Sequence, residues 1–282
     1  MNIAKTIDNA RKEIGRLRSA GKTVALVPTM GALHEGHISL IRQARDYADY
    51  VVVSIFVNPE QFGPNEDFDT YPREPEDDLK KCRDEGVALV FAPSGNEMYN
   101  EQKFLSIIIS SLNNQMCGAS RPGFFEGVLL IVNKLFNIIR PDFALFGQKD
   151  IQQFQIISTM VREFNHNINL VMAPIERAND GLALSSRNTY LTDEERLTAP
   201  GLYRALQYIE KQVIDGVHTP KLLIEHQKSE LEAKGFRIDY LGMFSFKTLQ
   251  QINTLQKGNI YILAGAVWLG KTRLIDNILI EF

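Results

Sequence analysis

Apolar and polar positions occur in alternating blocks that predict short buried strands separated by helices. Residues 23–27 and 50–57 are continuous apolar runs, as in strands covered on both faces, and residues 38–48 between them show helical spacing. We expect further strands at 87–91, 104–110, 143–146 and 169–173 and further helices at 75–85, at 124–139 and from Asp150. This alternation predicts an α/β fold, a Rossmann-like doubly wound parallel sheet.

The pattern changes after Pro174. Thr192 and Glu195 form a capping box that opens a long predicted helix, and a second helix is predicted at 220–233. Three short strand-like runs follow. We therefore expect residues 1–175 to form the Rossmann-like domain and residues 176–282 a smaller α+β C-terminal domain.

Charge and cysteine content exclude several classes of protein. The formal net charge of -3, from 31 basic and 34 acidic residues, gives no field that attracts nucleic acid or an anionic membrane. Cys82 and Cys117 are too few for a disulfide framework, and no apolar run is long enough to span a membrane. A cytoplasmic protein is expected.

A pair of histidines, His34 and His37, lies where the first of these strands gives way to a helix. A helix N-terminus favours anions, and Gly31 and Gly36 allow a ligand to approach the backbone closely. Two imidazoles here are suited to donate hydrogen bonds to phosphate oxygens. The alternative is that they cap the turn or bind a metal, although their spacing is one residue too short for the zinc-protease motif.

Two later clusters also suit a nucleotide. Gly147-Gln148-Lys149-Asp150 follows a predicted strand, where a lysine can reach a phosphate, and Ser185-Ser186-Arg187-Asn188 combines hydroxyl donors with a guanidinium. An ordinary helix cap with a solvated lysine explains the first cluster equally well.

Polar residues between these clusters suggest a hydroxylated substrate and a cation. The amides of Asn58 and Gln61 suit a polar substrate, and the adjacent carboxylates of Asp77 and Asp78 suit Mg²⁺, held directly or through water. The alternative for the two aspartates is the acidic first turn of a helix.

The segment Gly265 to Thr272 matches the P-loop pattern GxxxxGK[ST] letter for letter. A working P-loop opens a helix and needs further strands, but only ten residues follow Thr272 and they read as a closing strand. We expect a tight turn between strands here.

Four segments, VPTMGALHEGH, NPEQFGPNEDFDTYPR, GQKDIQQFQ and DGLALSSRN, occur in the order and spacing of the pantothenate synthetase family, within the nucleotidyltransferase superfamily. The chain resembles that family from its first helix to its KTRLIDNI tail. The resemblance implies ATP-dependent condensation of (R)-pantoate with β-alanine through a pantoyl adenylate, with release of AMP and pyrophosphate. It also implies Mg²⁺, a C-terminal lid that closes over the nucleotide, and a homodimer.

The resemblance also assigns roles to residues. His37, His34, Lys149 and Arg187 would be catalytic, with His37 the proton donor. Gln61 and Gln153 would bind pantoate, with Gln61 also near the β-alanine position. We expect Asn58, singled out above for its amide, to join them in binding pantoate and β-alanine. The ATP contacts would come from Met30, Gly31, Ala32, Leu33, His34, Glu35, Gly36, His37, Gly147, Gln148, Lys149, Asp150, Glu176, Leu184, Ser185, Ser186 and Arg187.

Two departures from the family and two rival functions remain. Phe124 stands where the family often has histidine, and Leu184 stands where methionine is common. Another nucleotidyltransferase of the same superfamily, or a nucleotide sensor without catalysis, would share the histidine motif. The glutamine pair and amine-dependent AMP release separate the synthetase from both.

Overall fold

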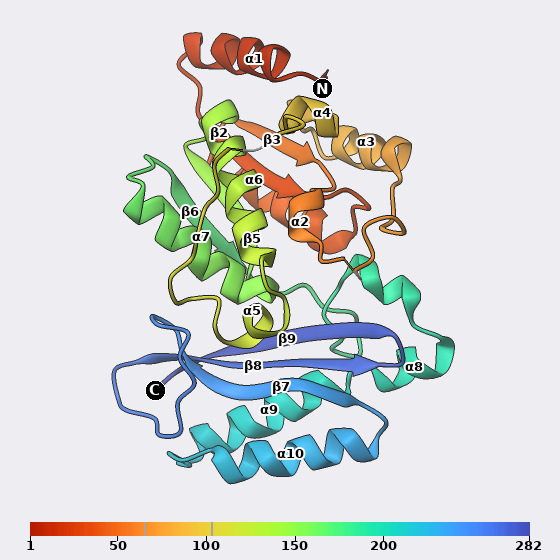
Figure 1. Cartoon of the computed structure of the whole chain (residues 1–282), viewed down its shortest axis with the longest axis vertical. Coiled ribbons are helices and arrows are strands. Elements are labelled where there is room, and N and C mark those ends of the chain that lie inside the picture. Colours follow the sequence, from red (N-terminus) through yellow and green to blue (C-terminus); the bar gives the residue numbers. More distant parts are fainter. Residues whose placement is uncertain (65, 103) are drawn as a thin grey trace. The chain divides into compact units, whose positions relative to one another are not determined.

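The computed structural model describes residues 1–64, 66–102 and 104–282, and it divides the chain into two compact units (Figure 1). The first comprises Met1–Ile109, Pro122–Gly147 and Ile156–Pro174, and the second comprises Ser110–Arg121, Gln148–Gln155 and Ile175–Phe282. The predicted division after residue 175 places residues 110–121 and 148–155 in the first domain, whereas their contacts group them with the second unit.

A parallel sheet forms the centre of the first unit. Its strands pair in the order β1-β4-β3-β2-β5-β6, and each neighbouring pair is parallel, which confirms the predicted doubly wound sheet. The order reverses between β2 and β5, which is where open α/β sheets bind ligands beyond their carboxyl ends. The strands are β1 (Asn2–Ala4), β2 (Val24–Thr29), β3 (Tyr50–Ile55), β4 (Leu89–Phe91), β5 (Phe143–Gly147) and β6 (Asn169–Ala173).

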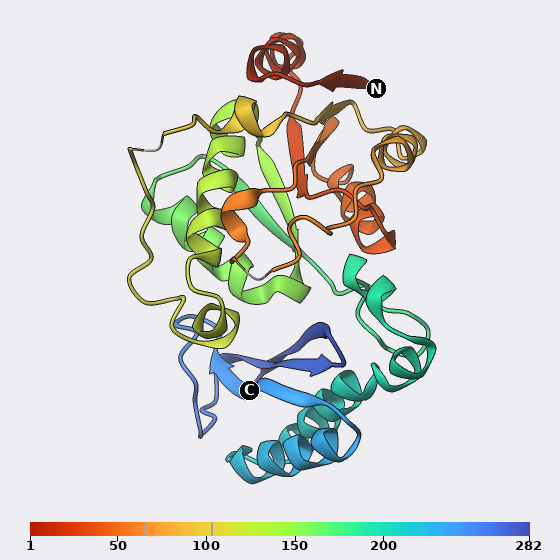
Figure 2. The same ribbon diagram turned by 45° about the vertical axis from the view of Figure 1, so that its right-hand side comes forward.

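Helices cover both faces of this sheet. Strands β3 and β4 lie on one side of β2 and strands β5 and β6 on the other, so right-handed crossover connections place their helices on opposite faces. Figure 2 shows α2 and α3 on one side and α6 and α7 on the other. Among the described residues, no helix combines the length and the apolar character needed to cross a membrane. The helices of this part of the chain are α1 (Ile7–Ser19), α2 (Glu35–Ala44), α3 (Pro75–Asp84), α4 (Gly95–Met98), α6 (Phe124–Ile139) and α7 (Ile151–Glu163).

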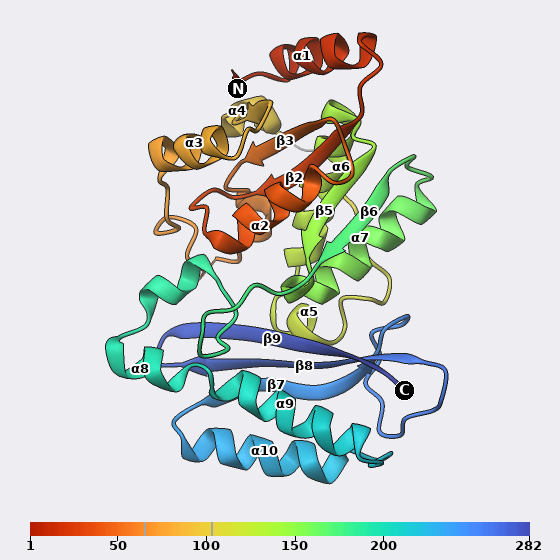
Figure 3. The same ribbon diagram turned by 180° about the vertical axis from the view of Figure 1, so that it is seen from behind.

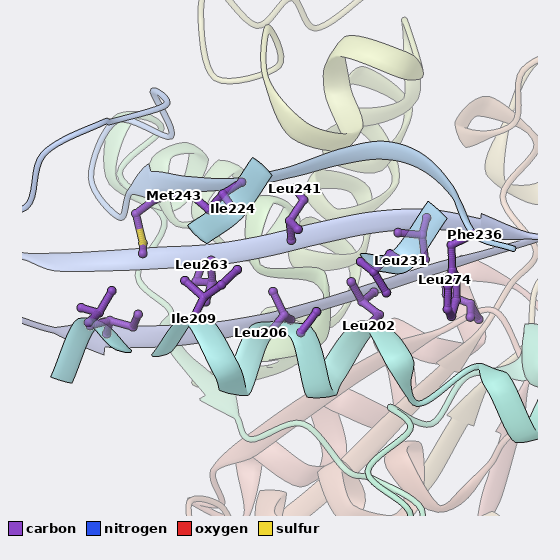
Figure 4. Close-up of a cluster of buried hydrophobic side chains, with 14 of the residues drawn as sticks. Leu202, Leu206, Ile209, Ile224, Leu231, Phe236, Leu241, Met243, Leu263 and Leu274 are labelled. Atoms are coloured by element: carbon purple, nitrogen blue, oxygen red, sulfur yellow. The ribbon is translucent and has the colours of Figure 1, made fainter. Parts of the chain in front are cut away.

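The second unit is an α+β structure, as predicted. Strands β7 (Arg237–Ser245), β8 (Ile260–Leu269) and β9 (Thr272–Glu281) form an antiparallel sheet in the order β7-β8-β9. One face of this sheet is covered by α9 (Gly201–Ile214) and α10 (Lys221–Ala233) (Figure 3). Figure 4 shows the apolar side chains of that interface, with Leu206, Ile209 and Leu263 almost completely buried.

Three element predictions differ from the structure. Residues 104–109 form no helix or strand in the described part of the chain, and the short edge strand β1 was not predicted. The capping box at Thr192 is present, but the long helix predicted after it is divided into α8 (Asp193–Thr198) and α9. Pro200 lies at this division, where its missing N–H and its ring disfavour a continuous helix.

The P-loop-like segment is a β-hairpin, as expected. Leu269 at the end of β8 pairs with Thr272 at the start of β9, which leaves Gly270 and Lys271 as a two-residue turn. Gly270 has a φ of 55°, in the left-handed region that such turns require. Because no helix follows, this segment lacks the N-terminal amides that cradle phosphate in a P-loop.

A carboxylate joins the starts of β2 and β3. One Asp49 carboxylate oxygen accepts hydrogen bonds from the Thr23 backbone N–H at 3.0 Å and the Thr23 hydroxyl at 2.9 Å. The other oxygen lies 3.0 Å from the Lys22 ammonium. The Thr23 backbone bond, followed by the Lys22 and Thr23 side-chain bonds, lowers the pKa of Asp49 from 3.8 to about 2.

This lowered pKa predicts an acid-dependent stability. Because the folded-state pKa lies below the unfolded value, Asp49 stabilises the fold above about pH 4 and loses that contribution as the pH falls toward 2. We expect Asp49→Asn to lower the urea midpoint at pH 7 and to differ less from wild type near pH 2.5. Urea unfolding at both pH values checks this, with the exposed Asp46→Asn as control. Equal pH profiles for the two variants would contradict the assignment.

Candidate active site

The loop between β2 and α2 carries the first histidine motif. His34 is the N-cap of α2, with extended backbone angles, and His37 lies in the first helical turn. Gly31 and Ala32 before them have positive φ values of 82° and 51°. The sharp turn directs the chain out of β2 and into the N-terminus of α2, where backbone N–H groups favour an anion.

Both histidines cap the helix that they introduce. The His34 Nδ1 accepts from the Gly36 N–H at 3.2 Å, the His37 Nδ1 accepts from the His34 N–H at 3.3 Å, and the ring centroids are 4.1 Å apart. A neutral imidazole that accepts at Nδ1 carries its hydrogen on Nε2. Helix capping was the alternative interpretation of these histidines. It is compatible with the proposed chemistry, because a ring that caps through Nδ1 still carries an Nε2–H that can donate a hydrogen bond.

Asp78 anchors this loop from α3. Its two carboxylate oxygens accept from the Ala32 N–H at 2.9 Å and the Leu33 N–H at 2.7 Å, and only 1% of the residue is exposed. A Cβ at Gly31 would lie 2.9 Å from one of these oxygens, so the loop is closely fitted to the carboxylate. Burial raises the pKa of Asp78, while the two backbone bonds act in the opposite direction.

The neighbouring Asp77 also acts on this loop, through a lysine. It forms an ion pair with Lys81 at 2.6 Å, and the Lys81 ammonium donates to the Leu33 carbonyl at 2.6 Å. Among the residues that the structure describes, no three His, Cys, Asp or Glu side chains gather as a metal site. The two predicted magnesium ligands thus have backbone and lysine partners in the described part of the chain.

Asn58 and Gln61 lie together after β3. Asn58 is buried, and its amide donates to the Gln61 Oε1 at 3.1 Å and to the Gly127 carbonyl at 3.1 Å. Its own oxygen accepts from the Tyr99 hydroxyl at 2.7 Å. This network orients the Gln61 amide, whose nitrogen lies 3.0 Å from the Met30 sulfur.

The turn that carries Gln61 lies directly against α6. It is the short 3₁₀ segment η1 (Pro59–Gln61), and a Cβ placed on Gly127 of α6 would overlap the Glu60 carbonyl. Only glycine at position 127 allows this close approach. The first compact unit therefore brings together the predicted residues Met30 to His37, Asn58, Gln61, Asp77 and Asp78.

The second cluster of predicted residues belongs to the other compact unit. Lys149 and Asp150 lie in the 3₁₀ turn η2 (Gln148–Asp150), with the ammonium 3.8 Å from the Asp150 carboxylate. The predicted pantoate ligand Gln153 is half-buried in the first turn of α7. Its neighbour Gln152 is buried and bonds to the Leu112 and Gln115 carbonyls at 2.9 Å and 2.8 Å, so it holds residues 112–118.

Local hydrogen bonds also hold the segment around Arg187. Ser185 caps the 3₁₀ turn η3 (Ser186–Tyr190), with its hydroxyl accepting from the Arg187 N–H at 3.3 Å. Leu184 donates its N–H to the Glu176 carbonyl at 2.9 Å. This pairing makes residues 176–184 a hairpin-like loop that leads into the predicted nucleotide contacts.

Sequence reasoning missed the buried and half-buried residues that hold these loops. Gln152, Arg177, Asp276 and Asn277 were not among the predicted site residues, and Asp78 was predicted for a different role. A signal was present for some of them, because Gln152 adjoins Gln153 in GQKDIQQFQ and the pair Asp276-Asn277 lies within the KTRLIDNI tail.

Comparison with known proteins gives one consistent result. Residues 2–279 match the family described as pantoate-beta-alanine ligase. The chain is 50% identical over 286 residues to the pantothenate synthetase of Carboxydothermus hydrogenoformans, covering 100% of this chain and 99% of that protein. It is 47% identical over 280 residues to the pantothenate synthetase of Pseudomonas savastanoi pv. phaseolicola, covering 99% and 98%.

Solved structures agree with this result. The pantothenate synthetase of Thermus thermophilus superposes with a TM-score of 0.91 at 39% identity, with 99% of each chain covered. The pantoate-beta-alanine ligase of Francisella tularensis, complexed with beta-gamma ATP and beta-alanine, gives 0.83 at 34% identity, with 99% of this chain and 97% of that chain covered. With its parallel sheet, its capped histidine loop and these matches over nearly its whole length, the chain belongs to the pantoate–β-alanine ligase family.

Proposed function

We propose that this protein is an enzyme that condenses (R)-pantoate with β-alanine to pantothenate at the expense of ATP, through a pantoyl adenylate. The observation that carries the proposal is the β2–α2 loop, which presents two imidazoles at a helix N-terminus and is held by a buried carboxylate. The Francisella tularensis relative, complexed with beta-gamma ATP and beta-alanine, supports the nature of the substrates.

The proposed chemistry needs little covalent catalysis. The pantoate carboxylate attacks the α-phosphorus of ATP and pyrophosphate leaves, and the β-alanine amine then attacks the acyl adenylate and displaces AMP. Met30 to His37 contact ATP, and His34 and His37 donate to phosphate oxygens whose negative charge grows during the first step. His37 is the proposed proton donor.

We propose that Gly147, at the end of β5, also contacts ATP, together with Gln148 to Asp150, Glu176 and Leu184 to Arg187 of the second unit. Lys149 and Arg187 offset phosphate charge, as a lysine ammonium and an arginine guanidinium do in other phosphate sites. Residues 176–282 are the proposed lid.

Pantoate is assigned to Gln61 and Gln153, with Asn58 holding Gln61. A neutral amide both donates and accepts, which suits a substrate that carries hydroxyl groups and a carboxylate. Mg²⁺ is proposed to enter with the ATP phosphates, because it commonly keeps several water ligands and binds through substrate phosphates.

A homodimer is proposed from the exposed apolar side chains of the segment 104–109. Phe104, Leu105 and Ile108 are 81%, 88% and 82% exposed, and the segment pairs with no strand in the described part of the chain. The sequence nevertheless predicts a strand here. A second copy of the chain, related by a two-fold axis, would pair with this edge and cover its apolar side chains.

The reaction itself gives the first test. With ATP and Mg²⁺, we expect AMP, pyrophosphate and pantothenate to form together only when pantoate and β-alanine are both present. His37→Ala should lower kcat by about 100-fold or more, since it removes a donor to developing charge. Coupled AMP detection and mass spectrometry of pantothenate measure this. The exposed His226→Ala is the control and should match wild type.

Two outcomes would count against this function. AMP release that ignores both acids would remove the substrate assignment, and an unchanged kcat in His37→Ala would remove the role of that histidine. Lys271→Ala, in the hairpin turn, should retain full activity, whereas a P-loop enzyme would lose its activity.

The adjacent aspartates provide a second test. Asp78→Asn keeps the shape of the side chain but leaves only one oxygen to accept from the Ala32 and Leu33 N–H groups, so we expect the KM for ATP to rise about 10-fold or more. Asp77→Asn should change it by about 3-fold or less, because that carboxylate acts only through an exposed ion pair. Steady-state kinetics at several Mg²⁺ concentrations compare the two variants. A larger defect in Asp77→Asn that high Mg²⁺ rescues would instead indicate direct metal ligation.

The dimer is tested by mass in solution. We expect wild type to be a dimer and Leu105→Glu/Ile108→Glu to be a monomer, because two carboxylates at this edge oppose apolar pairing. Size-exclusion chromatography with light scattering measures the mass. Leu222→Glu, at an equally exposed leucine in α10, should remain a dimer. A monomeric wild type, or a double variant that stays dimeric, would refute the proposed interface.

A further inference from the structure

Asn277 on β9 holds the backbone of the turn that carries Lys149. The residue is 2% exposed, and its side-chain amide donates to the Gln148 carbonyl and the Lys149 carbonyl, both at 3.0 Å. Its oxygen accepts from the Gln148 side-chain amide at 3.2 Å. All of these residues belong to the second compact unit.

An asparagine is chemically suited to this position. The turn Gln148–Asp150 is a single 3₁₀ turn, and an amide NH₂ has two hydrogens with which to satisfy two carbonyls. Aspartate would keep the shape but would offer no donor, and leucine would offer neither donor nor acceptor. Buried carbonyls without a partner are costly, so the bonds also determine where the turn lies.

The preceding residue, Asp276, reaches a different segment. It is 5% exposed, and its carboxylate forms a bidentate ion pair with Arg177, with distances of 2.5 Å and 2.8 Å. The Arg177 guanidinium also donates to the Gly181 carbonyl at 3.0 Å and lies 3.6 Å from the centre of the Tyr203 ring. Asp276 thereby holds the loop 176–184, which leads into Ser185 to Arg187.

Asp276 also interacts with the charge of Lys149. Burial raises the pKa of this carboxyl, the Arg177 ion pair opposes that rise most strongly, and the Lys149 ammonium makes a smaller contribution in the same direction as Arg177. The dipeptide Asp276-Asn277 is thus linked to Lys149 by hydrogen bonds to its backbone and by the electrostatic field at its side chain.

We infer that Asn277 is a positioning residue for Lys149, and that with Asp276 it holds both nucleotide-contacting segments of the second unit in register. This inference rests on the proposed function, in which Lys149 offsets phosphate charge. A shift of about 1 Å in a group that acts on the reacting atoms can cost about 100-fold in rate. The side chain of Asn277 does not itself meet the substrate in this assignment.

A double-mutant cycle tests the inference. Asn277→Ala, Lys149→Ala and the double variant are compared with wild type in kcat, in KM for each substrate and in the ATP dissociation constant from calorimetry. We expect Asn277→Ala to lower kcat/KM for ATP by about 10-fold to 100-fold. In the Lys149→Ala background, the same substitution should cost less than about 3-fold, because the group through which it acts is gone.

Controls separate positioning from loss of structure. Asn259→Ala removes a partly exposed asparagine that bonds to the Gln256 carbonyl, and it should match wild type. If Asn277→Ala does not fold, Asn277→Asp supplies the same cycle, because it lacks the donor hydrogens and keeps the volume. Circular dichroism and thermal unfolding confirm that each variant compared is folded.

The outcomes are distinct. If the fold-loss in kcat/KM of the double variant equals the product of the two single losses, the inference is overturned. Such a result would show that Asn277 acts on structure independently of Lys149. If wild type forms no pantothenate, the proposed function fails, but the ATP dissociation constant still decides the inference. Weaker ATP binding in Asn277→Ala only when Lys149 is present would support it, and equal weakening in both backgrounds would overturn it.

Discussion

Parallel strands carry loops to one edge of a sheet, but the regular hydrogen bonds of the ladder end where the strands end. Each loop of the candidate site therefore depends on a buried polar side chain that satisfies backbone groups beyond the strand. Asp78 does this for the β2–α2 loop and Asn277 does it for the turn after β5. Because an unsatisfied buried N–H or carbonyl is costly, each of these side chains selects one loop conformation.

This arrangement divides the candidate site residues into those proposed to contact the ligand and those that hold them in place. His34 and His37 cap the helix, and they are also the proposed hydrogen-bond donors to the phosphate oxygens. The capping bonds orient their rings before ATP binds. Asn58 orients Gln61 in a comparable way through a network that includes Tyr99. Catalysis that relies on positioning and on charge stabilisation gains most from such prior ordering.

The sequence predicts a large part of the fold, since buried strands and amphipathic helices have clear periodicity. The helix 124–139 and the strand 169–173 have the predicted bounds. The strand expected at 104–110 is absent because an apolar alternation identifies a strand-like segment but not its partner. Likewise, the histidine motif is visible from local spacing, whereas Asp78 lies 46 residues from Ala32 and Asn277 lies 128 residues from Lys149. Only the folded chain shows such pairs.

The P-loop-like segment has a structural role, because its turn determines the register of two strands. Its final two-residue turn sets the register of β9 against β8, so that Asp276 pairs with Gly265 and Asn277 with Ala264. Since side chains alternate between the two faces of a strand, a slip of one residue would turn Asn277 away from Gln148 and Lys149. The glycines have packing reasons as well, because a Cβ at Gly265 would lie 2.8 Å from Leu202 of α9. The same letters that suggest a nucleotide loop thus place the two residues that hold the proposed nucleotide-contacting segments.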